Sequence, residues 1–281
     1  MKELVLRNGI SIPQIGLGTW QITDREKVKE IVGAAYDEGY RLIDTAAAYT
    51  NEMAIGKAIQ SLELSREELI LSDKVWNTCR GYDAVRDACY KSMKKLKITY
   101  LDLYLIHWPA SPKLYPNWKE INADTWRGME SLYKEGIVKA IGVCNFKVHH
   151  LEELKKTADI MPFVNQIECH PGMMQKELVE YCEENQIQIE ASSPLGNGQI
   201  LQNEVLKKIA LEKGKTPAQI CMRWGIQKEM ILIPKTSNTE RLSQNIDIFN
   251  FELSNEEMAQ IDNIPYCGGL GYDSDEVIEF G

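Results

Sequence analysis

Several short apolar segments of the chain are each followed by a side chain capable of acid–base chemistry. Asp44 ends the apolar run Leu42-Ile43, Tyr49 follows five residues later, Lys74 ends a second run, and His107 follows a third. Such runs predict parallel strands, whose carboxyl ends meet at one edge, where α/β proteins bind their ligands. We therefore expect these side chains to converge on one site.

This combination favours the protonation of an oxygen. A tyrosine hydroxyl has an ordinary pKa of about 10 and is a poor acid at neutral pH, but a neighbouring ammonium lowers that pKa. Tyr49 beside Lys74, with Asp44 holding the ammonium, would be a tuned general acid, and His107 could orient a carbonyl oxygen. Each side chain alone also has a structural explanation: a helix cap, a packed ring, a solvated amine or a core histidine. The set contains no nucleophile, so its chemistry requires a hydride source.

A second cluster predicts a phosphate site. The last apolar run is followed by Lys235 and Thr236, and Arg241 stands where the next helix should begin. Cations and hydroxyls at a helix N-terminus are typical phosphate ligands, although charged loops are often simply solvated. The run Gly16–Thr19 is not a dinucleotide fingerprint of the Rossmann fold, because Gln21 occupies the place of the third glycine.

The apolar runs alternate with amphipathic segments in eight consecutive units. We expect strands at Ile15–Gly18, Leu42–Asp44, Leu69–Val75, Leu101–Ile106, Val138–Val143, Phe163–Ile167, Ile187–Ala191 and Met230–Ile233. We expect helices at Arg25–Glu38, Glu52–Leu62, Asp83–Leu96, Asp124–Lys134, Val148–Thr157, Gln175–Asn185, Asn203–Lys213 and Thr239–Asn245, with two more opening at Thr216 and Ser254. Eight such units predict an α/β fold, the closed (β/α)8 or TIM barrel.

Two segments lie outside this pattern, although we expect residues 1–281 to form a single domain. Residues 1–13 alternate around Asn8-Gly9, the preferred pair for a two-residue type I′ turn, so they predict a β-hairpin that Pro13 stops. Residues 266–281 follow the extra C-terminal helix and carry several acids but neither Lys nor Arg. If this C-terminal tail folds over the site, anionic substrates are disfavoured.

The composition argues against several classes of partner and site. The net charge of −9, without a basic stripe, argues against nucleic acid. The seven cysteines form no C-x-x-C pair, so neither a metal site nor a disulfide framework is expected. The polar N-terminus and the lack of a long apolar run predict a cytoplasmic protein that does not enter a membrane. We expect a monomer or a weak oligomer.

Longer motifs follow one another in order along nearly the whole chain. They are Asp44-Thr45-Ala46-x-x-Tyr49-x-Asn51-Glu52, Leu105-Ile106-His107-Trp108-Pro109, Gly142-Val143-x-Asn145-Phe146, Asn165-Gln166-Ile167, Ser193-Pro194-Leu195-Gly196, and Ile233-Pro234-Lys235 followed by Arg241. Together they resemble the aldo-keto reductase family, and among its branches the bacterial diketogluconate and glyoxal reductases. The resemblance implies a barrel that binds NADPH without a Rossmann domain and reduces small aldehydes and ketones by hydride transfer.

The resemblance also implies roles for individual residues. Tyr49 would donate the proton, Lys74 and Asp44 would tune it, and His107 would orient the carbonyl substrate. The implied cofactor residues are Gly18, Thr19 and Trp20 after the first strand, Asn145 and Gln166 at the nicotinamide carboxamide, Ser192 beside the nicotinamide ring, Ser193, Leu195 and Gly196 along the pyrophosphate, Lys235, Thr236 and Arg241 at the 2′-phosphate, and Gln244 and Asn245 at the adenine. Trp20, Trp76 and Trp108 would form the walls of an apolar substrate pocket.

Four residues depart from the family pattern. Ser192 replaces the usual aromatic residue, so the ring that stacks on the nicotinamide is missing. Cys144 replaces a serine and is a weaker hydrogen-bond donor, Gln244 replaces a common glutamate, and Asp73, which should point away from Lys74, replaces a small hydroxyl residue. The missing ring leaves open an NADP-binding, redox-sensing subunit with little turnover. A barrel isomerase or lyase that uses Lys74 as a Schiff-base amine is the third possibility.

Overall fold

Eight parallel strands, paired in the order β3 to β10, form a closed sheet. The computed structural model describes residues 2–276. The strands are β3 (Leu17–Gly18), β4 (Leu42–Asp44), β5 (Ile70–Val75), β6 (Leu101–Ile106), β7 (Val138–Cys144), β8 (Val164–Glu168), β9 (Gln188–Ser192) and β10 (Ile231–Ile233). The first and last strands close the sheet: Gly16 N donates to Leu232 O over 2.8 Å, and Gly18 N donates to Pro234 O over 3.0 Å. The predicted barrel is therefore confirmed.

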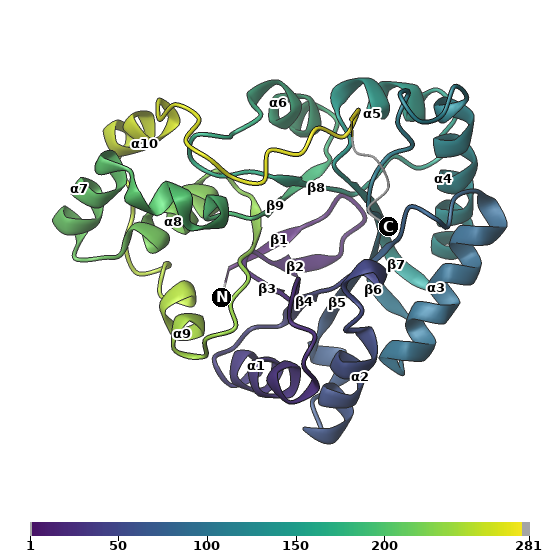
Figure 1. Ribbon diagram of the computed structural model, residues 1–281, viewed down its shortest axis with the longest axis horizontal. Helices are drawn as coiled ribbons and strands as arrows, with labels where there is room; N and C mark the ends of the chain where they lie inside the picture. Colours follow the sequence, from purple (N-terminus) through teal and green to yellow (C-terminus); the bar gives the residue numbers. More distant parts are fainter. Residues whose placement is uncertain (1, 277–281) are drawn as a thin grey trace.

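Helices surround the sheet (Figure 1). They are α1 (Arg25–Asp37), α2 (Glu52–Ser61), α3 (Tyr82–Leu96), α4 (Trp118–Lys134), α5 (Val148–Lys155), α6 (Lys176–Glu184), α7 (Glu204–Lys213), α8 (Pro217–Gln227), α9 (Glu240–Ile246) and α10 (Asn255–Asp262), with 3-10 turns at Ala47–Tyr49, Arg66–Glu68 and Gly196–Gln202. Within the described residues, no helix combines the length and the apolar composition that crossing a membrane requires.

The helix boundaries agree with the predicted ones except at α4. The capping box at Thr216 is present, since its hydroxyl accepts from Gln219 N over 3.3 Å and Gln219 Oε1 accepts from Thr216 N over 2.9 Å. Helix α4 begins at Trp118 rather than at the predicted Asp124. Most side chains of its first two turns are half-buried, and the one that is buried, Asn122, is polar, so buried apolar residues do not mark these turns.

The predicted N-terminal hairpin is present, with a different turn. It pairs β1 (Glu3–Val5) with β2 (Ser11–Pro13). Leu6 N donates to Ile10 O over 2.8 Å, so the loop has three residues rather than two, and its last residue, Gly9, has a φ of +86°. A three-residue loop that ends in the left-handed region is a common alternative to the type I′ turn. Loop side chains bond to backbone carbonyls at the amino ends of β7, β8 and β9, so the hairpin covers that end of the barrel.

The C-terminal tail crosses the opposite end of the barrel. After α10 it runs past β8 towards α5 (Figure 1). Glu168, at the end of β8, accepts from Leu270 N over 2.6 Å and from Gly271 N over 2.8 Å. Ser111 Oγ donates to Asp275 O over 2.7 Å. The tail is thus held over the carboxyl ends of the strands; residues 277–281 of the predicted tail lie outside the described residues.

Candidate active site

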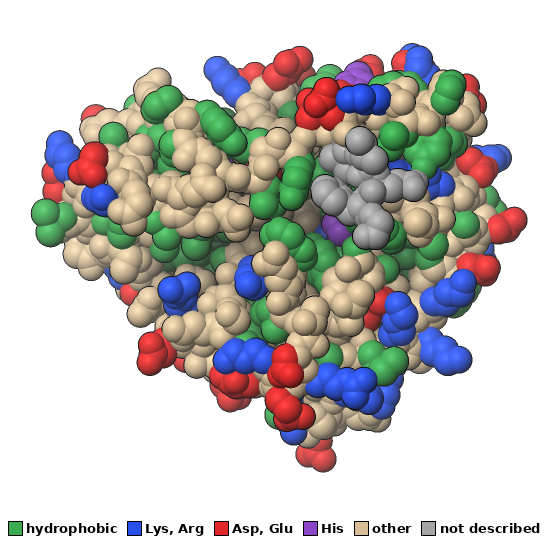
Figure 2. All heavy atoms as spheres, viewed as in Figure 1, with side chains coloured by type: hydrophobic (Ala, Val, Ile, Leu, Met, Phe, Trp, Pro, Cys, Tyr) green, Lys and Arg blue, Asp and Glu red, His purple; other side chains and the backbone are tan. Residues whose placement is uncertain are grey.

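The carboxyl ends of the strands surround a cavity of about 820 Å³, a size typical of small-molecule sites. In Figure 2, charged side chains lie mainly at the periphery of this face, whereas hydrophobic ones gather near its centre. The predicted site residues that line the cavity are Gly18, Trp20, Asp44, Tyr49, Trp76, His107, Trp108, Asn145, Gln166, Ser192, Ser193, Leu195, Lys235 and Arg241. Residues far apart in the sequence therefore meet at the end of the barrel where we expected them.

Lys74 lies behind the cavity wall and connects Asp44 to Tyr49. Its Nζ donates to both carboxylate oxygens of Asp44 over 2.6 Å, to Thr45 O over 2.8 Å and to Tyr49 Oη over 3.4 Å. The parallel pairing of β4 with β5 places Asp44 opposite Ser72, so Lys74 lies two residues further along, on the same face. The side chain of Lys74 is fully buried, and that of Asp44 nearly so.

The pKa values of the buried pair follow from burial and charge. Burial alone would lower the pKa of Lys74, but the charge of Asp44 raises it further, so the amine remains an ammonium. Burial raises the pKa of Tyr49, and the charge and hydrogen bond of Lys74 lower it by less. The expectation of a net lowering is therefore wrong. The phenol remains protonated at neutral pH, as a proton donor must, and the Lys74 ammonium lies where it would stabilise a phenolate.

His107 presents a neutral imidazole beside the phenol. Its ring lies edge-on to Tyr49, with centroids 5.7 Å apart, and edge-on to Trp76, with centroids 5.3 Å apart. Burial and then the charge of Lys74 hold the pKa of His107 well below its ordinary value. A neutral imidazole has one N–H group and can donate it to a carbonyl oxygen.

The two predicted amides present acceptor oxygens. Asn145 Nδ2 donates to His107 O over 3.0 Å. Gln166 Nε2 donates to Asp44 Oδ1 over 3.1 Å and to Glu190 Oε1. Both N–H groups of Gln166 are used within the barrel, so its Oε1 is left to accept a hydrogen bond at the cavity. The NH2 group of a ligand's carboxamide needs such an acceptor.

Glu190 is a buried acid that our sequence analysis missed. Its side chain is inaccessible to solvent. Burial and then the charge of Asp44 raise its pKa to about 8, so the carboxyl is largely neutral at pH 7. Glu190 and Ser192 are two residues apart on β9 and face the same side; this alternation was the available signal.

The Glu190→Gln variant should become increasingly more stable than the unmodified protein as the pH rises. The folded-state pKa lies above the unfolded value of about 4.5, so the unfolded chain loses this proton first. The carboxyl therefore destabilises the fold progressively between about pH 4.5 and pH 8, and the amide does not. Relative to pH 4.5, the Glu190→Gln variant should gain roughly 1–3 kcal/mol of unfolding free energy by pH 8. Urea unfolding at three pH values measures this gain, and a gain that does not grow with pH contradicts the assignment.

Two cations lie at the end of the cavity where the sequence predicts a phosphate site. Lys235 and Arg241 line the cavity, and within the described part of the chain neither makes an ion pair. The Thr236 hydroxyl, in contrast, donates to Asn238 O over 3.2 Å and accepts from Asn238 N over 3.0 Å. The cations thus remain available to an anionic ligand.

Five predicted cofactor residues do not line the cavity: Thr19, Gly196, Thr236, Gln244 and Asn245. Thr19 is buried, and its hydroxyl donates to Asp44 O over 2.8 Å. Gln244 is exposed on α9, and Asn245 is buried beneath it. Their contact with a cofactor stays a prediction.

Sequence reasoning also missed part of the cavity wall. Lys147, Glu168, Leu270, Tyr272 and Ser274 line it. Glu168 lies two residues after Gln166 on β8, so strand alternation could have identified it. No local pattern indicated that the tail residues would return to the site.

Comparisons with known proteins point to one family. Residues 14–265 match the aldo/keto reductase family. A glyoxal reductase of Bacillus subtilis (strain 168) is 47% identical and covers 99% of this chain and 98% of its own, and a methylglyoxal reductase of Escherichia coli (strain K12) is 40% identical over 96% of each. Among solved structures, a variant of Gox0644 in complex with NADPH is similar, with a TM-score of 0.91 and 38% identity over 99% of both chains. An aldo-keto reductase from a Medee basin deep-sea metagenome library has a TM-score of 0.92 and 40% identity, covering 98% of this chain and 100% of its own.

Proposed function

The chain belongs to the aldo/keto reductase family, and we propose that it reduces small aldehydes and ketones with Tyr49 as the proton donor. It is an NADPH-dependent oxidoreductase that converts a carbonyl group to an alcohol. The observation that carries the assignment of Tyr49 is its contact with Lys74, whose ammonium is anchored by both carboxylate oxygens of Asp44. The names of the relatives, glyoxal reductase and methylglyoxal reductase, favour a reductase that turns over rather than a sensor with little turnover or a Schiff-base lyase.

The residues at the site fit NADPH, which supplies the hydride. The free cations Lys235 and Arg241 suit a 2′-phosphate, because a guanidinium and an ammonium both form charge-assisted hydrogen bonds with phosphate oxygens. The acceptor Oε1 of Gln166 and the side chain of Asn145 suit the nicotinamide carboxamide. Ser192 and Ser193 line the same cavity.

The side chains of the protein perform the remaining steps. The neutral imidazole of His107 donates a hydrogen bond that orients the substrate oxygen, and the Tyr49 hydroxyl passes its proton to that oxygen as negative charge develops. Lys74 stabilises the resulting phenolate, and Asp44 fixes the ammonium in place. Trp20, Trp76 and Trp108 form apolar walls that exclude water from the reacting atoms.

The proposal also covers the substrate class, the domain organisation and the setting in which the protein works. Because two relatives bear the names glyoxal reductase and methylglyoxal reductase, we propose small dicarbonyl compounds as substrates. We also propose that residues 1–281 form one domain, that the protein works in the cytoplasm as a monomer or weak oligomer, and that it binds no nucleic acid. The net charge of −9 supports the last point.

NADPH should bind at least about tenfold more tightly than NADH, because only NADPH carries a phosphate for the two free cations. Fluorescence titration of both nucleotides measures the ratio of dissociation constants. The Lys235→Ala/Arg241→Ala variant should lose most of this preference, while Lys29→Ala, which removes an exposed cation on α1, should keep it. Equal dissociation constants in the unmodified protein would refute the phosphate assignment.

A further inference from the structure

Lys147 is the cation that lines the cavity beside the predicted substrate wall, and the tail neutralises it. We propose that the tail acids Asp273 and Asp275 make this reductase select uncharged carbonyl compounds over those that carry a carboxylate. This inference rests on the proposed function and adds two specificity-determining residues to it. Its basis is the position of Lys147 in the cavity wall and the two ion pairs that occupy its ammonium.

The position of Lys147 makes it the natural ligand for a substrate anion. It lies two residues after Asn145 and lines the same cavity as His107 and Trp108. The side chain is 35% exposed, so its ammonium is neither deeply buried nor freely solvated. An ammonium in a cavity wall attracts anionic ligands unless an acid of the protein is already paired with it.

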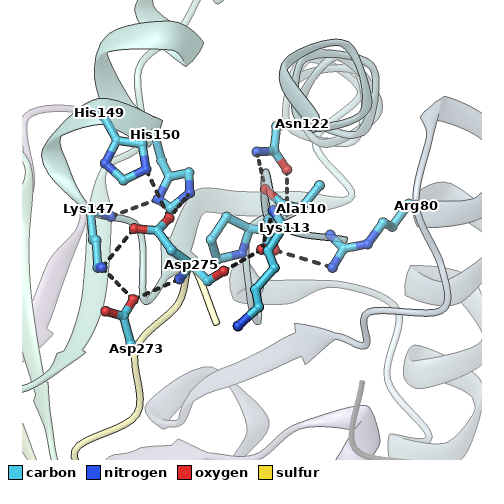
Figure 3. A network of polar contacts seen from close by, with 11 residues as sticks. Arg80, Ala110, Lys113, Asn122, Lys147, His149, His150, Asp273 and Asp275 are labelled. Atoms are coloured by element: carbon cyan, nitrogen blue, oxygen red, sulfur yellow. Dashed lines mark hydrogen bonds and ion pairs between the residues drawn. The ribbon is translucent and has the colours of Figure 1, made fainter. Parts of the chain in front are cut away.

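Two acids of the tail occupy this ammonium (Figure 3). Lys147 Nζ donates to Asp275 Oδ2 over 2.8 Å and to Asp273 Oδ1. Asp273 Oδ1 also accepts from Asp275 N over 2.9 Å, which fixes the two acids relative to each other. One positive charge thus meets two negative charges, and the pairing presents a net negative charge to an approaching carboxylate.

The tail acids are held in this position by their neighbours. Ser111 Oγ donates to Asp275 O over 2.7 Å, and Tyr272 lies edge-on to Trp108 with centroids 6.1 Å apart. Residues 272–275 therefore flank the predicted substrate wall on one side and Lys147 on the other. Tyr272 and Ser274 line the cavity themselves, so the acids and the substrate pocket belong to one surface.

Of the two histidines beside Asp275, His149 shares a hydrogen bond with the tail, and the proton position of His150 argues against a bound metal ion. Nε2 of His149 and of His150 lie 3.0 and 3.2 Å from Asp275 Oδ1. His150 Nδ1, however, accepts from Lys147 N over 3.2 Å, so the proton of the neutral ring is on Nε2, the atom that a metal would need deprotonated. Burial lowers the pKa of His150 to about 3, so this ring lies beside Asp275 without adding a positive charge.

No other cation is left for a substrate anion in the described part of the cavity wall. Apart from Lys147, the lysine and arginine residues that line it are Lys235 and Arg241, which the proposed function assigns to the cofactor phosphate. Glu168 adds a further carboxylate to the same wall, where it accepts from two backbone N–H groups of the tail. An anionic substrate would therefore meet two or more acids and no unpaired cation.

The test compares two benzaldehydes that differ in charge. 4-Nitrobenzaldehyde and 4-carboxybenzaldehyde have similar size and both carry an electron-withdrawing group, but only the second is an anion at pH 7. The measured quantity is the ratio of kcat/KM for the carboxylate compound to that for the nitro compound, with NADPH. We expect the Asp273→Asn/Asp275→Asn variant to raise this ratio by about three- to tenfold, mainly through KM, because a freed ammonium binds ground state and transition state alike.

Two further variants isolate the charge of Lys147. Adding Lys147→Met to the double variant should return the ratio to the unmodified value or below it. Glu276→Gln, which removes a tail charge that faces Lys113 at 3.7 Å rather than Lys147, should leave the ratio unchanged. Dividing by the nitro compound removes any general effect of a loosened tail, and the dissociation constant of NADPH reports whether the variants remain folded.

The outcomes separate this inference from the function on which it rests. Suppose that the unmodified protein reduces 4-nitrobenzaldehyde but the double variant leaves the kcat/KM ratio unchanged. The role of the tail acids is then overturned, and the proposed function is not. The same conclusion follows if the ratio rises in the double variant and stays high when Lys147→Met is added. No reduction of either aldehyde by the unmodified protein overturns the proposed function, and this inference with it.

Discussion

Replacing Tyr49 with phenylalanine should lower kcat for aldehyde reduction by about 10³-fold, because the general acid is removed and no other acid at the site replaces it. His107 is neutral, and the ammonium of Lys74 is already occupied by Asp44 and the Thr45 carbonyl. The dissociation constant of NADPH should change by less than about twofold, since the phenol supplies no phosphate contact. Stopped-flow absorbance at the nicotinamide band measures the first quantity, and fluorescence titration measures the second.

Tyr36→Phe is the matched control for the Tyr49 variant. Tyr36 Oη donates to Glu68 over 2.6 Å on the side of the amino ends of β4 and β5, away from the cavity, so this change also removes one tyrosine hydroxyl from a hydrogen bond. Its kcat should be close to that of the unmodified protein. Turnover by Tyr49→Phe at the unmodified rate would end the proposed mechanism.

Removing Lys74 should lower kcat by about 10²- to 10³-fold, since the developing phenolate loses its counter-charge. The single change Lys74→Met also leaves Asp44 buried without a partner, which should destabilise the fold by about 3–5 kcal/mol. The Lys74→Met/Asp44→Asn variant removes both charges and should recover most of that stability. It should not recover turnover, because the counter-charge beside Tyr49 is still absent.

The stability and the turnover of these variants are measured separately. Urea unfolding compares the single and double variants, and single-turnover reduction compares both with the unmodified protein. If the double variant turns over at the unmodified rate, Lys74 serves only to hold the fold together.

The positions of the proposed catalytic residues could be predicted from the sequence, because Asp44, Lys74 and His107 stand at the ends of apolar runs that become buried strands. Strand β6, for example, is buried along its whole length, and His107 comes directly after it. Parallel pairing then brings successive strand ends together, whatever the helices between them contain. The depth of burial could not be predicted in the same way. The sequence identifies Lys74 as a neighbour of Tyr49, but only the packed barrel shows that burial outweighs its charge in setting the pKa.

The path of the tail depends on contacts that no local pattern encodes. Glu168 holds the backbone of Leu270 and Gly271, about a hundred residues away in the sequence. Asp273 and Asp275 were visible as acids, but their pairing with Lys147 follows from the position of α5. The loop of the N-terminal hairpin shows the same limit on a smaller scale, since Asn8-Gly9 is compatible with both a two-residue and a three-residue turn.

The pH dependence of alcohol oxidation tests the central claim most directly, namely that the ammonium of Lys74 stabilises the phenolate of Tyr49. In this direction the phenolate must accept the proton, so kcat/KM with NADP+ should rise with pH as the phenolate fraction grows. In the Lys74→Met/Asp44→Asn variant the rising limb should move to higher pH, because Lys74 lowers the pKa of Tyr49 by more than Asp44 raises it. If kcat/KM for alcohol oxidation rises over the same pH range in both proteins, the result contradicts this account.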